Sequence, residues 1–366
     1  MHDVIIVGGG VAGSYLASII SKKYDVLLIE KNPKPVAKDS GIVSKRFFDI
    51  FPNDAKRLVK HEIRRMDFTP PYAELFSLKS EDPFAFILER EMFSKFLAKS
   101  AAKRSEAVFE PAISAKIFPD HVSVKTPDNT YNAKIVVGCD GTSSVVRKAM
   151  NIETPRMAVG IMVKTRQKIE GEVNVFLNKY FSPDFFSWVI PQNYEYGLMT
   201  CIRPREYLDY FVKNMYLPPG SMHAHMIPYT YVRSYGTRSL LVGDSCGQNK
   251  PLTGGGIIFS LKAAQYACTM INDSLEYERY EPGFLRYYEH YWRKDLASEI
   301  KKQLFFRKIY RNLANKEIDT LAAKLGPRIS EINNFDYDRL STVLRHLPKW
   351  RVAGLMLPKM VHAVFS

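Results

Sequence analysis

A glycine cluster near the N-terminus is the feature that most restricts the fold of this chain. Val4 to Val7 form an apolar, β-branched run, which is typical of a buried strand. Gly8, Gly10 and Gly13 follow in GxGxxG spacing, and a helical pattern continues to residue 20. In such a unit the first glycine permits the turn, the second lets the backbone approach a pyrophosphate, and the third lets helix and strand pack closely. The segment therefore predicts a nucleotide-binding strand–turn–helix unit.

A second strand strengthens this prediction. Residues 24–29 form another apolar run, and Glu30 follows directly. A carboxylate at this point is placed to accept hydrogen bonds from the ribose hydroxyls of an adenosine. These residues alone leave FAD and NAD open as the bound nucleotide.

Three later segments favour one large cofactor. An NAD domain would continue as further strand–helix units in register, with a substrate domain behind them. Instead, residues 87–101 place Arg90 at the start of an amphipathic helix, and residues 135–150 form a strand that runs into a turn with Asp140. Residues 238–267 form a strand that ends on Asp244, followed by three consecutive glycines and a long helix. Separate strand-to-turn units of this kind indicate a cofactor that spans several parts of the chain.

Taken together, these motifs resemble the FAD-dependent enzymes of the para-hydroxybenzoate hydroxylase type. Within that group, GDxxGxxxPLTGGGI from residue 243 and FSWVIP at 186–191 are similar to the geranylgeranyl reductase family, including the archaeal digeranylgeranylglycerophospholipid reductases. The resemblance covers residues 1 to about 310 and implies an α/β fold. It implies a Rossmann-type FAD-binding domain (1–150 and 235–275), an inserted antiparallel β-sheet substrate domain (151–234) and a C-terminal helical region (276–366).

The same resemblance assigns residues to an FAD site. It implies that the pyrophosphate is faced by Gly8, Gly10, Ala12 and Gly13, that Glu30 meets the ribose, and that Arg90 meets the phosphates or ribose. Asp244 is expected at the ribityl or pyrophosphate region, and the backbone of Gly256 and Ile257 at the isoalloxazine ring. The remaining residues assigned to the cofactor are Lys31, Asp39, Gly41, Ile113, Asp140, Gly254 and Gly255. For Arg90, Asp140 and Asp244, a surface ion pair, a turn or a helix cap is the alternative interpretation.

The middle of the chain changes to short alternating strands, which predict an antiparallel sheet over the flavin. Its aromatic residues suit a polyprenyl chain, which offers methyl groups and π-bonds but nothing to hydrogen-bond. The expected substrate wall consists of Phe185, Phe186, Trp188 and Pro191, with Pro251 from the late loop. Core packing is the alternative interpretation of these aromatic residues.

The resemblance implies a reductase that saturates isolated double bonds of geranylgeranyl chains, with a hydride from reduced FAD and a proton from another group. Many family members carry a cysteine just ahead of a GxxS stretch near the flavin, but this chain has Lys38, Asp39 and Ser40 there. A mechanism that needs that thiol is therefore excluded. Tyr180, the flavin and a bound water are the candidate proton donors. An FAD monooxygenase or epoxidase and a non-catalytic prenyl-lipid carrier stay open as alternatives.

The formal net charge of +14 favours anionic partners. Nucleic acid is not expected, because the charge is spread along the chain and no nucleic-acid-binding pattern occurs. A single dinucleotide fingerprint leaves no separate NADPH domain, so NADPH bound transiently or an acidic ferredoxin is the expected electron donor. The four scattered cysteines predict no metal site.

The chain contains no apolar run of about 18 residues, so a cytoplasmic location is expected. The basic, apolar segment 348–366 predicts either a helical cap on the core or peripheral contact with an anionic membrane surface.

Overall fold

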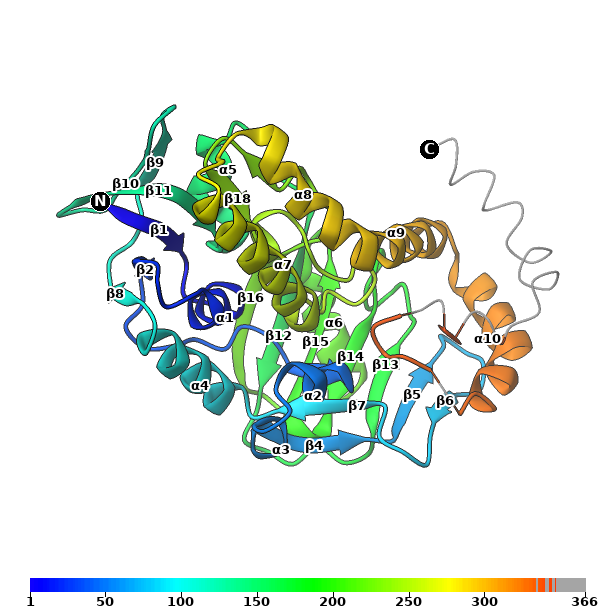
Figure 1. Cartoon of the computed structure of the whole chain (residues 1–366). Coiled ribbons are helices and arrows are strands. Elements are labelled where there is room, and N and C mark those ends of the chain that lie inside the picture. The colour runs from blue at the N-terminus through cyan, green and yellow to red at the C-terminus, as the bar shows by residue number, and fades with distance from the viewer. Residues whose placement is uncertain (334, 340–341, 344–345, 347–366) are drawn as a thin grey trace.

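The computed structural model describes residues 1–333, 335–339, 342–343 and 346. Two large sheets and a group of C-terminal helices make up this part of the chain (Figure 1). The expected membrane-contact segment 348–366 lies outside the described residues.

The first sheet has eight strands and holds the glycine cluster at one strand end. Strands β8, β2, β1, β11 and β18 are parallel neighbours, while β17 pairs with β18, β10 with β11 and β9 with β10 in antiparallel fashion. The run Val4–Val7 is fully buried in β1, as a parallel strand covered on both faces requires. The strands are β1 (His2–Val7), β2 (Val26–Ile29), β8 (Glu106–Val108), β9 (Ser114–Ile117), β10 (Val122–Lys125), β11 (Thr130–Gly138), β17 (Tyr235–Gly236) and β18 (Ser239–Leu241).

Helices cover this sheet. On one face α1 packs between α4 and α7, and α8 packs against α7. On the other face α5 contacts β11 and β9. The helices are α1 (Val11–Ile19), α4 (Arg90–Ala102), α5 (Val145–Ala149), α7 (Ile257–Glu276) and α8 (Pro282–Trp292).

The second sheet has seven strands in the order β16-β12-β15-β14-β13-β5-β6. All its pairs are antiparallel except β13 with β5. Helix α6 (Pro204–Asn214) covers its outer face, where Leu208 and Phe211 join the core. The strands are β5 (Arg65–Thr69), β6 (Phe76–Lys79), β12 (Met157–Lys164), β13 (Val173–Phe176), β14 (Ser187–Ile190), β15 (Glu195–Thr200) and β16 (Ser221–Pro228).

This sheet differs from the expected substrate domain in its boundaries. It draws β5 and β6 from the segment that the sequence analysis assigned to the FAD-binding domain. Met66 and Phe68 of β5 lie opposite Val173 and Val175 of β13, so one continuous apolar face extends across both segments. A pairing over about a hundred residues leaves no local signal in the sequence.

A small sheet connects the two parts. It has the order β3-β7-β4 and carries two short helices before it enters α4. These elements are β3 (Ile42–Ser44), α2 (Arg46–Ile50), α3 (Ala55–Leu58), β4 (Val59–Ile63) and β7 (Ala85–Leu88).

After α8 the chain passes through a π-helical turn at Arg293–Ala297 into α9 (Ser298–Arg311) and α10 (Asn315–Ser330). Helix α10 packs on β6, and Gly326 approaches the ring of Phe76 closely. Over the described residues, the helices are all too short or too polar to cross a membrane.

Candidate active site

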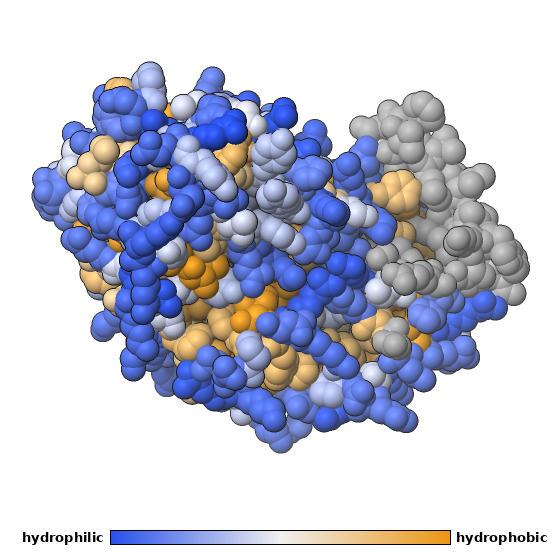
Figure 2. Space-filling model, in the orientation of Figure 1, coloured by the Kyte–Doolittle hydropathy of each residue, from blue (hydrophilic) through white to orange (hydrophobic). Residues whose placement is uncertain are grey.

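A single cavity of about 1050 Å³ is lined by residues of both sheets. The glycine loop after β1, the segment 30–42 and the loop before α7 line one part of it. The face of the seven-stranded sheet and helices α9 and α10 line the rest. Apolar side chains also gather across the middle of the molecular face in Figure 2, around α1, α2 and α4 of Figure 1.

The loop between β1 and α1 forms a tight cradle in this cavity. Gly8 has a φ of +99°, and a Cβ at Gly8 would lie 2.4 Å from the carbonyl oxygen of Cys139. A Cβ at Gly13 would lie 1.8 Å from the carbonyl oxygen of Gly8. Gly10 and Ala12 line the cavity, where the backbone N–H groups at the start of α1 favour an anionic ligand. The loop thus offers a site for a diphosphate, and positions 8 and 13 have no room for a residue larger than glycine.

Glu30 fixes this loop from the end of β2. One carboxylate oxygen accepts a hydrogen bond from the N–H of Gly9 at 2.6 Å, and the other accepts one from the N–H of Asn32 at 2.9 Å. Carboxylate oxygens have further lone pairs, so Glu30 can also accept from a ribose hydroxyl. Lys31 lies beside it in the cavity lining.

Arg90 holds the segment before β3 through a bidentate ion pair. Its Nε and Nη2 donate to the two oxygens of Asp39 at 2.7 and 2.8 Å. The Arg90 side chain is only 7% exposed, whereas Asp39 is 43% exposed towards the cavity. Burial raises the pKa of Asp39, but Arg90 and the N–H of Gly41 outweigh burial, so the pKa is lowered overall. Asp39 is therefore a carboxylate whose charge Arg90 balances.

Two further acids lie at the carboxyl ends of parallel strands. Asp140 follows β11 and accepts from the N–H groups of Val145 and Val146 at 2.7 and 3.3 Å, while its Oδ1 is buried without a partner in the part of the chain that the structure describes. Burial raises the pKa of Asp140. Asp244 follows β18, and burial together with the charge of Asp39 raises the pKa of Asp244 to about 6. Both carboxyl groups line the cavity and suit the hydroxyl donors of a nucleotide.

The glycine run 254–256 lines the cavity next to Asp244, since a Cβ at Gly256 would lie 3.6 Å from Oδ1 of Asp244. Gly254 has a φ of +71°, and the backbone N–H of Lys250 donates to the carbonyl oxygen of Gly255 at 3.1 Å. Gly254, Gly255, Gly256 and Ile257 all line the cavity. A flat ring can approach such a backbone closely, because no Cβ intervenes.

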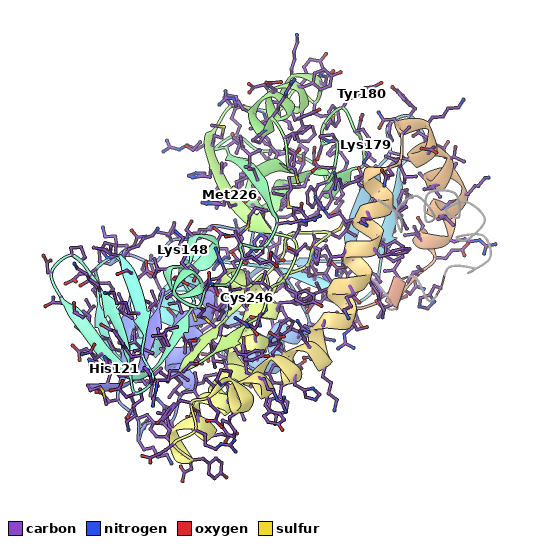
Figure 3. The ribbon with its side chains drawn as sticks, turned by 90° about the horizontal axis from the view of Figure 1, so that it is seen from above. His121, Lys148, Lys179, Tyr180, Met226 and Cys246 are labelled. Atoms are coloured by element: carbon purple, nitrogen blue, oxygen red, sulfur yellow. The ribbon has the colours of Figure 1, made fainter. Side chains whose placement is uncertain are left out.

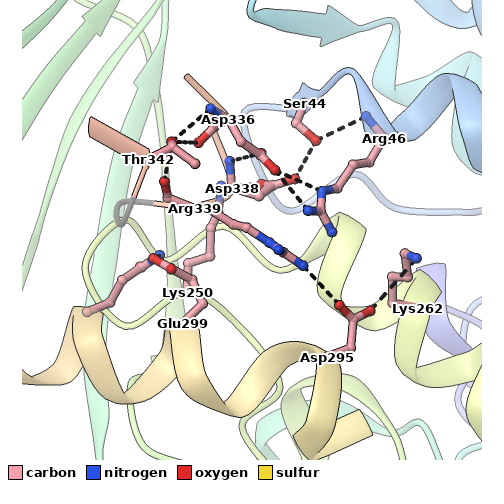
Figure 4. A network of polar contacts seen from close by, with 11 residues as sticks. Ser44, Arg46, Lys250, Lys262, Asp295, Glu299, Asp336, Asp338, Arg339 and Thr342 are labelled. Atoms are coloured by element: carbon pink, nitrogen blue, oxygen red, sulfur yellow. Dashed lines mark hydrogen bonds and ion pairs between the residues drawn. The ribbon is translucent and has the colours of Figure 1, made fainter. Parts of the chain in front are cut away.

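A buried ionic network holds the chain beyond α10 against this loop (Figure 4). Nζ of Lys250 lies 2.8 Å from Oδ1 of Asp338, and both side chains are less exposed than 5%. Ser44 donates to the other oxygen of Asp338, and Arg46 pairs with Asp336 at 2.8 Å. The network brings Phe335 and Tyr337 into the cavity lining, although no sequence motif marked this segment.

The cavity extends from the nucleotide part into an apolar arm. Phe186, Trp188 and Ile190 alternate along β14 with their side chains towards it. Beyond them, side chains of β5, β13, α9 and α10 enclose the arm, among them Phe68, Val175, Leu177, Phe306, Leu325 and Ile329.

Most predicted residues meet in this cavity, but some do not. Within the described part of the chain, the predicted residues outside its lining are Gly13, Ile113, Tyr180, Phe185, Pro191 and Pro251. The alternation of side chains along β14 explains the positions of Phe185 and Pro191. Phe186, Trp188 and Ile190 face the cavity, so the residues between and beside them point away from it, and Phe185 is 1% exposed in the core. Ile113 is 54% exposed, and Leu252 takes the cavity position beside the buried Pro251.

Tyr180 is 56% exposed, and Figure 3 shows it at the outer end of the molecule. The structure therefore does not bring Tyr180 to the cavity as a proton donor. Ser44, the serine of the GxxS stretch, donates a hydrogen bond to Asp338 in the buried ionic network.

Sequence reasoning also missed Glu195, which is fully buried beside Trp188 and Ser40. Its position on the cavity-facing row of β15 depends on strand register, which the sequence alone does not reveal.

Comparisons with known proteins agree with this geometry. A model of an NAD(P)-binding Rossmann-like domain matches residues 6–39. Digeranylgeranylglycerophospholipid reductase 2 of Methanothermobacter thermautotrophicus is 26% identical, over 94% of this chain and 99% of the relative. A geranylgeranyl bacteriochlorophyll reductase-like protein of Thermoplasma acidophilum has a TM-score of 0.83 at 21% identity, over 99% of this chain and 98% of that one. Over nearly its whole length the chain is therefore similar to the geranylgeranyl reductase family.

More distant neighbours share the fold of this family. The halogenase PltM, solved with phloroglucinol and FAD, has a TM-score of 0.68 at 15% identity, over 89% of this chain and 80% of that one. The predicted fold class, a Rossmann-type domain with an inserted sheet domain, is confirmed.

The residues of the cavity fit FAD. The Gly8–Ala12 cradle suits a diphosphate, and Glu30 suits a ribose. The unpartnered Oδ1 of Asp140 suits a hydroxyl donor, and the glycine run 254–256 suits a flat ring system. A single cavity holds all four features.

Proposed function

We propose that this protein is an FAD-dependent reductase that saturates isolated double bonds in geranylgeranyl chains. The observation that carries the proposal is the continuity of the nucleotide cradle with an apolar arm in one cavity. The archaeal relatives that match nearly the whole chain bear the name digeranylgeranylglycerophospholipid reductase, which supports this substrate class. Halogenase-like flavoproteins share the fold at lower similarity and remain the distant alternative.

The proposed cofactor contacts follow from the geometry. The N–H groups at the start of α1 hold the diphosphate, Glu30 holds the adenosine ribose, and Asp140 and Asp244 accept from hydroxyl groups of the bound nucleotide. When bound and reduced, FAD supplies the hydride for the double bond.

The apolar arm binds the prenyl chain by shape. Most of its side chains are apolar, and burial of each CH₂ group contributes about 0.8 kcal/mol. Trp188 and Phe186 lie where the arm meets the nucleotide part, so they orient one double bond towards the ring site. The same walls exclude water from an alkene that reacts only when it is held in line with both hydrogen sources.

An anaerobic experiment tests the proposal. The protein is loaded with FAD, reduced with dithionite and mixed with a geranylgeranyl glycerophospholipid. We expect the lipid to reoxidise the flavin and to gain two hydrogens per double bond, as measured by absorbance and mass spectrometry. Turnover only with oxygen uptake would indicate a monooxygenase instead. Lipid binding without reoxidation would indicate a carrier protein.

We further propose that an acidic electron-carrier protein such as a ferredoxin delivers the electrons, since the chain carries a net charge of +14. NADPH is the alternative donor. Electrostatic docking predicts that the rate of flavin reduction falls as ionic strength rises. A rate that stays constant over a wide range of salt would contradict this proposal.

Peripheral membrane contact through residues 348–366 also stays a proposal. Deletion of these residues should weaken binding to anionic vesicles but not to neutral ones. Unchanged binding to anionic vesicles would rule it out.

A further inference from the structure

A buried glutamate lies directly behind the cavity wall. Glu195 begins β15, opposite Ile190 of β14 and Lys164 of β12 in register, and its side chain is 0% exposed. Glu195, Gly197 and Met199 alternate on the cavity side of the strand. Gly197 leaves room for the ring of Trp188, and Met199 contacts the glycine run at Gly254.

Glu195 reaches the cavity through its hydrogen-bond partners. Its Oε1 accepts from Nε1 of Trp188 at 3.2 Å and from the hydroxyl of Ser40. Ser40 and Trp188 both line the cavity, and Asn193 holds the backbone of Ser40 with a 2.7 Å hydrogen bond to its carbonyl oxygen. The second oxygen of Glu195, Oε2, is buried without a partner among the described residues.

These surroundings favour the protonated carboxyl group. Burial raises the pKa of Glu195, and the negative charge of Asp39 adds to this effect. The hydrogen bonds from Ser40 and Trp188 and the positive charge of Lys164 oppose it without reversing it. An unpaired buried carboxylate oxygen is costly, whereas a neutral acid avoids most of this penalty. Lys164 nevertheless lies close enough to stabilise the carboxylate once the proton has left.

Two neighbouring titratable groups, Asp39 and His225, are less suited to donate. Arg90 keeps the pKa of Asp39 low, so Asp39 has no proton to give near neutral pH. Burial and the charges of Lys38 and His223 lower the pKa of His225, which favours its neutral form.

We propose that Glu195 is the proton source for alkene reduction and that the hydroxyl of Ser40 passes this proton into the cavity. The inference rests on the proposed reductase function and deepens it. One alkene carbon receives the hydride from the reduced flavin, and the other receives the proton of the Ser40 hydroxyl. In the structure the Ser40 hydroxyl donates to Oε1 of Glu195. For the transfer this hydroxyl turns towards the alkene, and the acidic proton of Glu195, then on Oε1, passes to the Ser40 oxygen. The C=C bond thus gains two hydrogens, and Glu195 becomes a carboxylate. Solvent protonates Glu195 again before the next turnover.

The variant E195Q separates proton supply from structure. Glutamine has nearly the same shape, and its carbonyl oxygen can accept the hydrogen bonds from Ser40 and Trp188, but it has no acidic proton. We expect E195Q to slow reoxidation of the reduced flavin by lipid on the order of 10²-fold or more, the usual contribution of a general acid. Reduction by dithionite and the affinity for FAD should stay at the wild-type values. The exposed acid Glu206 on α6 provides the matched control E206Q, which should behave as wild type.

Ser40 variants test the second step. S40A should slow the same half-reaction, and S40T, which keeps the hydroxyl, should restore much of the rate. Because the two residues act in one relay, the S40A/E195Q double variant should be about as slow as either single variant. Additive losses would show that the residues do not act in sequence.

The wild-type rate of flavin reoxidation should fall as pH rises through the raised pKa of Glu195, and the rate of E195Q should not show this fall.

Infrared difference spectra between acidic and alkaline pH test whether Glu195 is protonated, in protein without cofactor or lipid. A carboxylic-acid band that titrates above the ordinary pKa of glutamate should be present in the wild-type protein and missing in E195Q, whereas the bands of Asp140 and Asp244 should persist in both proteins. Failure of the wild type to reduce lipid would refute the reductase function but leave this band. An E195Q variant that reoxidises at the wild-type rate, or a wild type without the band, would overturn the role of Glu195.

Discussion

Replacement of Asp244 by asparagine should stabilise the protein without cofactor and weaken its binding of FAD. The pKa of Asp244 is raised from its ordinary value of 3.8 to about 6 by burial and by the neighbouring charge of Asp39. A shift of about two units corresponds to at most about 3 kcal/mol, at about 1.4 kcal/mol per unit. Water in the cavity screens part of this charge, so we expect D244N to gain about 1–3 kcal/mol at neutral pH.

The pH dependence has a definite sign. Because the folded-state pKa lies above the unfolded value, the ionised Asp244 destabilises the fold at pH values above about 6. This penalty disappears as pH falls towards 3.8, where Asp244 is protonated in both states. Asparagine does not ionise, so its advantage should be fully present at about pH 7.5 and reduced to about a third at about pH 4.5.

Chemical unfolding of the protein without FAD at these two pH values measures the stability difference. The same variant should bind FAD about 10–100-fold more weakly, since a hydrogen bond to a charged acceptor contributes about 1.5–3 kcal/mol. D244N with wild-type stability at about pH 7.5, or with an equal gain at both pH values, would refute the electrostatic reasoning. Wild-type affinity for FAD would refute the assignment of Asp244 to the cofactor site.

Five other variants test three separate parts of the site. A Cβ at Gly13 would lie 1.8 Å from a backbone oxygen, whereas one at Gly10 meets no atom within 4 Å. G13A should therefore lower the melting temperature without cofactor, while G10A should leave it unchanged and weaken FAD binding, as fluorescence titration would measure. D338A leaves the buried ammonium of Lys250 unpaired and should cost about 3–5 kcal/mol in denaturant unfolding, most of which K250M/D338L should recover. L325W should fill the apolar arm and raise the KM for lipid but keep FAD affinity, and an unaltered KM would contradict the proposed path of the chain.

The parts of the fold that the sequence predicts are those with local causes. The run at Val4–Val7, the glycine spacing after it and Arg90 at the start of α4 each depend on neighbours within a few residues. The turns that place Asp140 and Asp244 at the cavity are likewise marked by short motifs. Such signals locate most of the predicted cofactor residues without knowledge of the tertiary structure.

The apolar arm and the buried acid have no local cause. The arm forms because β5 pairs with β13 and because α10 packs on β6, and both contacts join segments far apart in the chain. Strand register decides that Trp188 faces the cavity and that Glu195 lies behind it. A shift of one residue in the strand register would turn both side chains to the opposite face of the sheet. The exposed Tyr180 shows the same limit, since residue type alone suggested it as a proton donor.

The acidic residues at and behind the cavity reduce the stability of the fold. Asp140 and Glu195 each keep one buried oxygen without a partner among the described residues, and burial raises the pKa of both groups and of Asp244. Each arrangement costs folding free energy, because a buried polar atom without a partner loses its hydration and gains nothing in return. A fold optimised for stability alone would replace these groups, as D244N is expected to demonstrate. Their location at or directly behind one cavity supports the proposed roles, in which Asp140 and Asp244 serve the nucleotide and Glu195 serves the alkene.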